Sequence, residues 1–136
     1  MIELTLAMAE QAVKAAQEKA RTLGTPMTVT VVDESGRLVL AARGDGAGFF
    51  TTETSRGKAM AAAAFRRATK DMAALREVAP AVWGNVATAV GGQMLPSIGA
   101  VPIIVQGKLV GAIGCGGGTG DQDHLCAEAG AAAISS

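Results

Sequence analysis

The stretch from residue 101 to residue 114, VPIIVQGKLVGAIG, constrains the fold more than any other part of the chain. Two runs rich in β-branched and apolar residues are separated there by only Gln106 and Gly107. A two-residue connection that contains glycine is typical of a tight β-hairpin, and strands joined in this way are antiparallel. The sequence therefore predicts a hairpin here, and the fold must contain a sheet that includes it.

A second pair of strands is predicted nearer the start of the chain. Residues 27–32 and 37–43 have β-rich compositions, and the turn signal Glu34-Ser35-Gly36 separates them. Before this pair, apolar residues recur at steps of three and four over residues 6–23. This spacing predicts an amphipathic helix, which Gly24 ends.

Two further helical regions complete the predicted order of elements. Residues 51–70 are expected to be helical, with a short continuation over 71–78 that Pro80 ends. The last helix is expected to run from a cap at Thr119 or Asp121 to about residue 134. Its inward-facing residues are expected to be Leu125, Ala129 and Ala132. Clustered antiparallel strands with helices laid over them indicate an α+β fold.

Composition limits the class of protein. The 136 residues, 49% of them apolar, suit one compact domain over residues 1–136. Twelve basic and twelve acidic residues balance, which argues against a nucleic-acid-binding face. Two cysteines are too few for a disulfide framework, so we expect reduced thiols and a cytoplasmic protein. The chain shows no secretory signal pattern and no apolar run long enough to span a membrane.

The segment GAIGCGGGTGDQD, residues 111–123, is a glycine-rich passage from the predicted hairpin into the last helix. Free backbone N–H groups at a helix start can bind an anion. The segment nevertheless lacks the Lys-Ser/Thr pair of a phosphate loop, and Asp121 and Asp123 already place negative charge at the helix start. We therefore expect the helix to cap itself, and the glycines to mark a close approach of the backbone to a neighbouring chain or a compact ligand.

Three charged side chains are candidates for a polar site. Arg43 and Asp45 flank a glycine at the end of a predicted strand, where they could bind an anionic group or form a simple ion pair. Lys58 follows Arg56 and Gly57 near the start of the second helix, where a cation opposes the helix dipole. A binding role and a solvated surface position both remain open for Lys58.

His124 is the only histidine, and it lies beside Asp121 and Asp123. One histidine with two carboxylates could form a weak oxygen-rich metal site, or the imidazole could be an axial ligand to a haem iron. The third interpretation is an exposed helix residue without a ligand. No metal site built from protein side chains is predicted.

The chain resembles the GlcG/HbpS family, which includes the C-terminal domain of PduO-type proteins. The resemblance depends on four segments: VTVVDESGRLVLAARGDGA, SRGKAMAAAAF with Thr69 after it, GAVPIIVQGKLVGAIG and GTGDQDHLCAEAG. It implies a profilin-like α+β fold, with helices packed on a five-stranded antiparallel sheet. It also implies a homo-oligomer, built from dimers into tetramers or octamers. Some members of the family bind haem or other tetrapyrroles, others are reported as lyases on small aromatic hydroxylamines, and many have no known activity.

We therefore predict a small-molecule-binding protein of the GlcG/HbpS type, whose ligand is haem, another tetrapyrrole or another apolar carboxylate. The predicted ligand-binding residues are Arg43, Lys58, Gly116, Gly117, Thr119 and His124. The alternative is a cofactor-independent lyase or isomerase that acts on a small aromatic acid. Its predicted catalytic residues are Arg43, Asp45 and Asp123. A third hypothesis is an assembly subunit without a ligand. Both ligand hypotheses require the polar ends after residues 43 and 114 to meet in space.

Overall fold

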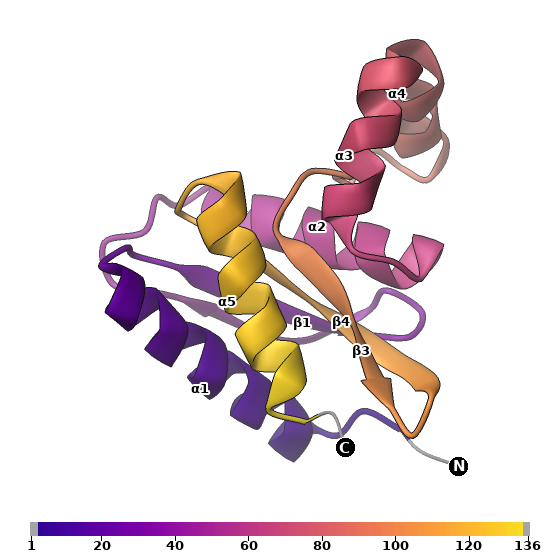
Figure 1. Cartoon of the computed structure of the whole chain (residues 1–136). Coiled ribbons are helices and arrows are strands. Elements are labelled where there is room, and N and C mark those ends of the chain that lie inside the picture. The colour runs from indigo at the N-terminus through magenta and orange to yellow at the C-terminus, as the bar shows by residue number, and fades with distance from the viewer. Residues whose placement is uncertain (1–2, 135–136) are drawn as a thin grey trace.

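The structure, a computed structural model, describes residues 3–134, which form one sheet with helices on both of its faces (Figure 1). The strands are β1 (Thr28–Asp33), β2 (Leu38–Arg43), β3 (Ala100–Val105) and β4 (Lys108–Gly116). The helices are α1 (Leu6–Leu23), α2 (Thr51–Phe65), α3 (Thr69–Val78), α4 (Pro80–Ala89) and α5 (Gly120–Ala132). The predicted α+β class is confirmed.

The sheet has the order β2-β1-β4-β3, and every neighbouring pair is antiparallel. Both predicted pairs of strands are confirmed, and Gln106 and Gly107 adopt φ values of 52° and 76° in the tight turn between β3 and β4. The expectation of five strands is wrong, because the described residues form four. That number came from the family resemblance alone, and the chain between the two hairpins forms helices instead.

Alternation along the strands sends side chains to two different layers. Val29 and Val31 of β1 join the core cluster that includes the buried residues of α1 and α5, whereas Thr28 and Thr30 face α2. Figure 1 shows α1 and α5 on the near face of the sheet and α2 on the far face. The apolar core therefore lies mainly between the sheet and the α1–α5 pair.

Helix α2 lies unusually close to the sheet. A Cβ added at Gly114 of β4 would meet the carbonyl oxygen of Ser55 and lie 2.8 Å from the backbone nitrogen of Ala59. Two buried hydroxyl pairs join α2 to β1: Thr28 with Thr51, and Thr30 with Ser55, each at 2.7 Å between oxygens. Buried hydroxyls need such partners, so these bonds set the position of α2 along the sheet.

The helical region after residue 51 differs from the prediction. Helix α2 ends at Phe65, because Arg66 adopts a left-handed φ of 58°. Thr69 then begins α3, and its hydroxyl accepts a hydrogen bond from the backbone N–H of Ala100 at 3.0 Å. Pro80 starts α4 instead of only ending the previous helix, as its fixed φ permits at a first helical position. Helices α3 and α4 extend away from the sheet in Figure 1.

The inward face predicted for the last helix is wrong. Leu125 is 41% exposed and Ala132 is exposed, whereas Ala129 is half-buried. The buried residues of α5 are Asp123, Cys126, Ala127, Gly130 and Ala131. Helix α5 lies against α1 and the sheet so closely that a Cβ at Gly130 would meet Ile113 and the backbone of α1. Small residues on that face permit the contact.

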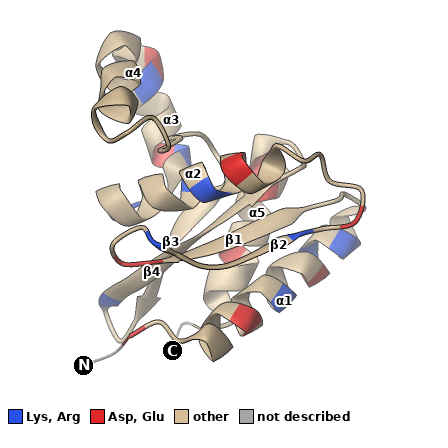
Figure 2. Cartoon of the chain, turned by 180° about the vertical axis from the view of Figure 1, so that it is seen from behind, with Lys and Arg blue, Asp and Glu red and all other residues tan. Residues whose placement is uncertain are grey.

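Charged residues of both signs are interspersed on the molecule, for example along the outer face of α1 (Figure 2). None of the helices within residues 3–134 combines the length and the apolar character that crossing a membrane requires.

Candidate functional site

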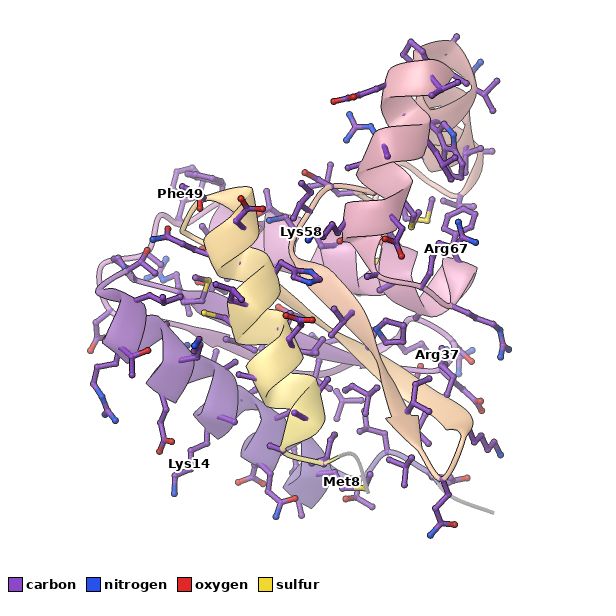
Figure 3. The ribbon with its side chains drawn as sticks, viewed as in Figure 1. Met8, Lys14, Arg37, Phe49, Lys58 and Arg67 are labelled. Carbon is purple, nitrogen blue, oxygen red and sulfur yellow. The ribbon has the colours of Figure 1, made fainter. Side chains whose placement is uncertain are left out.

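A buried ion pair joins two segments that are far apart in the sequence. The Lys58 ammonium of α2 lies 2.9 Å from Oδ2 of Asp123 in the first turn of α5. Lys58 Nζ also donates to the carbonyl oxygen of Cys115 at 3.0 Å. Lys58 is 7% exposed and Asp123 is 3% exposed. Figure 3 labels Lys58 in the region where α2 and the start of α5 come together.

The start of α5 positions the carboxylate of this pair. Thr119 is the N-cap, and it exchanges hydrogen bonds with Gln122 in a complete capping box. The self-capping predicted for the glycine-rich passage is therefore confirmed. Oδ1 of Asp123 accepts from the backbone N–H of Gly118 at 2.9 Å, so both carboxylate oxygens are hydrogen-bonded.

Gly99 provides the space in which the pair lies. Its φ is +137°, and an added Cβ would lie 2.9 Å from each of three atoms: Lys58 Nζ, Asp123 Cβ and the Cys115 oxygen. A side chain at this position would displace the ion pair. Nothing in the sequence marks Gly99, because its role depends on a contact with three segments that are distant from it in the chain.

Burial changes the acidity of the groups around the pair. Burial raises the pKa of Asp123 above its usual 3.8, although the hydrogen bond from Lys58 opposes this effect. Burial also raises the pKa of the Cys115 thiol well above its usual value and that of Cys126 to about 11. Both cysteines are therefore protonated at neutral pH, and they are poor nucleophiles.

The ion pair borders an open pocket of about 310 Å³. This volume is near the lower limit of the ~300–1,000 Å³ that is typical of ligand sites. Its polar part consists of Lys58, Asp123, Ser97 and the backbone at 116–118, and its apolar part includes Phe50 and Leu95. The remaining lining residues are Thr51 and Thr54. A molecule with one polar end and an apolar body suits this distribution.

The sequence model of the family described as haem degrading protein HbpS-like matches residues 4–132. The chain belongs to the HbpS-like family. An uncharacterized 15.0 kDa protein of Citrobacter freundii is 32% identical over 92% of this chain and 87% of its own length. Protein GlcG of Escherichia coli K12 is 34% identical over 82% of this chain and 79% of its own.

Solved structures agree with this assignment. Protein ORFY of Klebsiella pneumoniae has a TM-score of 0.89 and 26% identity, and it covers 98% of this chain and 92% of its own. A double mutant of HbpS from Streptomyces reticuli has a TM-score of 0.87 and 32% identity over 100% of this chain and 90% of its own. A PduOC–haem complex has a TM-score of 0.87 and 28% identity over 98% and 96%. Haem therefore binds to a member of this family.

Four of the predicted site residues come together at the pocket: Lys58, Gly116, Gly117 and Asp123. Arg43 and Asp45 are exposed and do not line it. Arg43 of β2 and Gly116 of β4 both pair with Thr28 of β1, which lies between them. The ends of β2 and β4 therefore lie at the same end of the sheet. Two strand spacings nevertheless separate them by about 10 Å. Both strands end there, but Arg43 does not reach the pocket.

Thr119 and His124 also lie outside the pocket lining. Thr119 is exposed and caps α5. The His124 side chain is only 12% exposed, and its Nε2 lies 3.3 Å from Oε2 of Glu128, so the exposed-residue interpretation is wrong. Nδ1 of His124 is buried without a hydrogen-bond partner. The metal-site interpretation of His124 required the Asp123 carboxylate, which is instead hydrogen-bonded to Lys58. Residues 3–134 contain no group of three or more His, Cys, Asp or Glu residues that could hold a metal ion.

Sequence reasoning missed the other half of the pocket. The lining residues that it did not predict are Phe50, Thr51, Thr54, Leu95, Ser97 and Gly118. Leu95 and Ser97 precede β3, and the backbone N–H of Leu95 donates to the carbonyl oxygen of Gly57 at 3.0 Å. A Cβ at Gly57 would lie 2.9 Å from that of Leu95, so the glycine lets this segment lie directly on α2. Gly57 is the sequence signal for this contact, since a glycine within a helix is unfavourable relative to alanine and here leaves room for Leu95.

Proposed function

We propose that this protein binds an apolar small molecule by a carboxylate, in the pocket beside Lys58 and Asp123. The observation that supports this proposal is the buried ammonium at the pocket wall. An ammonium has three N–H donors, and Cys115 and Asp123 accept two of those of Lys58. Because Lys58 lines the pocket, we assign its third donor to a ligand anion, and charge-assisted hydrogen bonds are roughly twice as strong as neutral ones.

Haem is the first ligand to consider, because a PduOC relative binds it. The polar part of the pocket suits a haem propionate. Haem iron is bound in proteins by His, Met, Tyr or a Cys thiolate, and the pocket lining contains none of these residues. Cys115 contacts Lys58 through its backbone carbonyl and not through its thiol. These residues do not fit an iron-ligated haem, so we propose recognition of the carboxylate without a step at iron.

A lyase or isomerase without a cofactor is the second candidate. The observation that favours it is the raised pKa of Asp123 at 2.9 Å from the Lys58 ammonium, an arrangement that can accept and return a proton. Arg43 and Asp45 have no part in this version, because they do not line the pocket. Turnover of small aromatic acids that is lost in Asp123→Asn would support catalysis, and turnover that is unchanged in this variant would exclude it.

The binding proposal predicts that two variants without the Asp123 charge change the affinity for an anionic ligand in opposite directions. Asp123→Asn should strengthen binding of 2-naphthoate about tenfold or more at pH 7, because it removes a negative charge beside the anion and keeps an oxygen that accepts from Lys58. Lys58→Met/Asp123→Asn should weaken it by roughly 10–100-fold, since no ammonium remains. Isothermal titration calorimetry measures both. Equal affinities for the double variant and the wild type would contradict the proposal.

Calorimetry also tests the pH dependence of ligand affinity. For 2-naphthalenesulfonate, which stays anionic, affinity should rise as the pH falls from 7 toward the raised pKa of Asp123, because the neutral carboxyl no longer repels the ligand. Asp123→Asn should show no such change.

A haemin titration tests whether His124 binds iron. The wild type and His124→Ala should give the same Soret band. A band that is lost only in His124→Ala would show iron ligation by His124 and contradict the pocket assignment.

We also propose the homo-oligomer that the family resemblance implies. Helix α4 buries none of its residues, and Val78, Val82 and Val90 are 84%, 57% and 54% exposed. Residues 78–107 contain no Lys, Arg, Asp or Glu, so a second copy meets no charge repulsion there. Light scattering should give a multiple of the 13.6 kDa chain mass, and a single-chain mass would contradict the proposal.

A further inference from the structure

We infer that Phe50 makes this pocket selective for ligands with a planar aromatic body. This inference rests on the proposed function, because it concerns the ligand of the same pocket. Phe49 and Phe50 are 77% and 57% exposed, although they are two of only three phenylalanines in the chain. Phe50 lines the pocket directly before α2.

The Phe50 ring has two neighbours, Phe49 and Gly48. The Phe49 and Phe50 rings are edge-to-face, with centroids 6.1 Å apart and planes at 87°. A Cβ added at Gly48 would lie 2.8 Å from Cε1 of Phe50, so the ring lies directly against bare backbone. An exposed aromatic side chain in a defined orientation presents a flat surface, and binding a ligand there costs little side-chain entropy.

The spacing along α2 indicates the size of the ligand. Phe50, Thr54 and Lys58 all line the pocket and follow each other at steps of four residues. Positions 50 and 58 are about 12 Å apart along a helix axis. An aromatic acid with one ring, bound to Lys58 by its carboxylate, extends only a short distance from the ammonium. An acid with two fused rings extends further toward Phe50.

Stacking separates aromatic ligands from saturated ones of the same charge. Any apolar body gains by covering Phe50 and Leu95, but only a π-system gains the additional aromatic term. That term corresponds to roughly a two- to tenfold difference in affinity. The wild type should therefore bind 2-naphthoate more tightly than decahydronaphthalene-2-carboxylate by this factor.

The test measures both acids by calorimetry on three proteins. Phe50→Leu should bind both acids with equal affinity, since leucine keeps an apolar surface without a ring. Phe65→Leu is the matched control, because Phe65 packs against Trp83 with centroids 5.4 Å apart and does not line the pocket. It should retain the aromatic preference. In NMR spectra, naphthoate protons should show upfield ring-current shifts with the wild type that are absent with Phe50→Leu.

The outcomes separate this inference from the proposed function. If the wild type binds both acids equally and Phe50→Leu changes neither affinity, the aromatic selectivity is wrong and carboxylate binding stands. If neither acid binds to the wild type, the proposed function fails, and the inference fails with it. If Phe50→Leu leaves the preference unchanged but lowers the mass in light scattering, the two rings belong to an interface between copies, and the inference is overturned.

Discussion

Lys58→Met should lower the free energy of unfolding by about 3–5 kcal/mol, because it leaves the buried Asp123 carboxylate without its ammonium. Methionine has a similar length, so packing changes little. Urea unfolding at pH 7 measures the loss. Without Lys58, the pKa of Asp123 rises further, and the folded state binds its proton at a pH where the unfolded chain does not. The stability of the variant should therefore increase as the pH falls from 7 toward that pKa.

Two further variants show whether the loss comes from the unpaired charge. Lys58→Met/Asp123→Asn should recover most of the lost free energy, because no buried charge remains unpaired. Lys70→Met, at an exposed position of α3, should change stability little. A double variant as unstable as Lys58→Met alone would mean that packing of the lysine stem, and not the ion pair, stabilises the fold.

The second large effect is expected from Gly114→Ala, which should cost about 3 kcal/mol. The added methyl would meet the Ser55 carbonyl oxygen and the Ala59 nitrogen, which are backbone atoms of α2 and cannot rotate away. Relief requires α2 to move from the sheet, and this strains the buried Thr30–Ser55 hydrogen bond. Thermal and urea unfolding measure the effect.

Gly84→Ala is the matched control for the change at Gly114. Gly84 is inside α4 with nothing within 4 Å of an added Cβ, so alanine should stabilise the protein by up to about 1 kcal/mol through helix propensity. Opposite signs for the two substitutions would confirm that close packing of α2 sets the cost. Equal small effects would show that α2 has room to shift.

Features that depend on neighbours in the chain were predictable. The Gln106-Gly107 turn, the end of α1 at Gly24 and the Thr119 cap all follow from local backbone geometry and hydrogen bonds within a few residues. The division of the long helical region at Arg66 was not predictable in this way. Thr69 is held by Ala100, 31 residues further along the chain, and no local pattern reports such a bond.

The candidate site also combines features that were predictable from the sequence with features that were not. Lys58, Asp123 and the glycines at 116 and 117 were identified as candidates, but as separate residues with several open interpretations. Their joint role depends on the register of β1 with β4 and on the approach of α2 to Gly114. Arg43 was predicted both as a ligand-binding and as a catalytic residue, yet the sheet places it two strands away from the pocket wall.

By itself, the sequence determined the two hairpins, both ends of α1 and the self-capped start of α5, because short-range sterics and hydrogen bonds decide these features. Only the tertiary structure decided that Lys58 and Asp123, 65 residues apart, form a buried pair beside an open pocket. It also decided that Phe50 and Leu95 belong to that pocket. Burial and ion pairing depend on which segments meet in space, and this meeting results from packing of the whole chain.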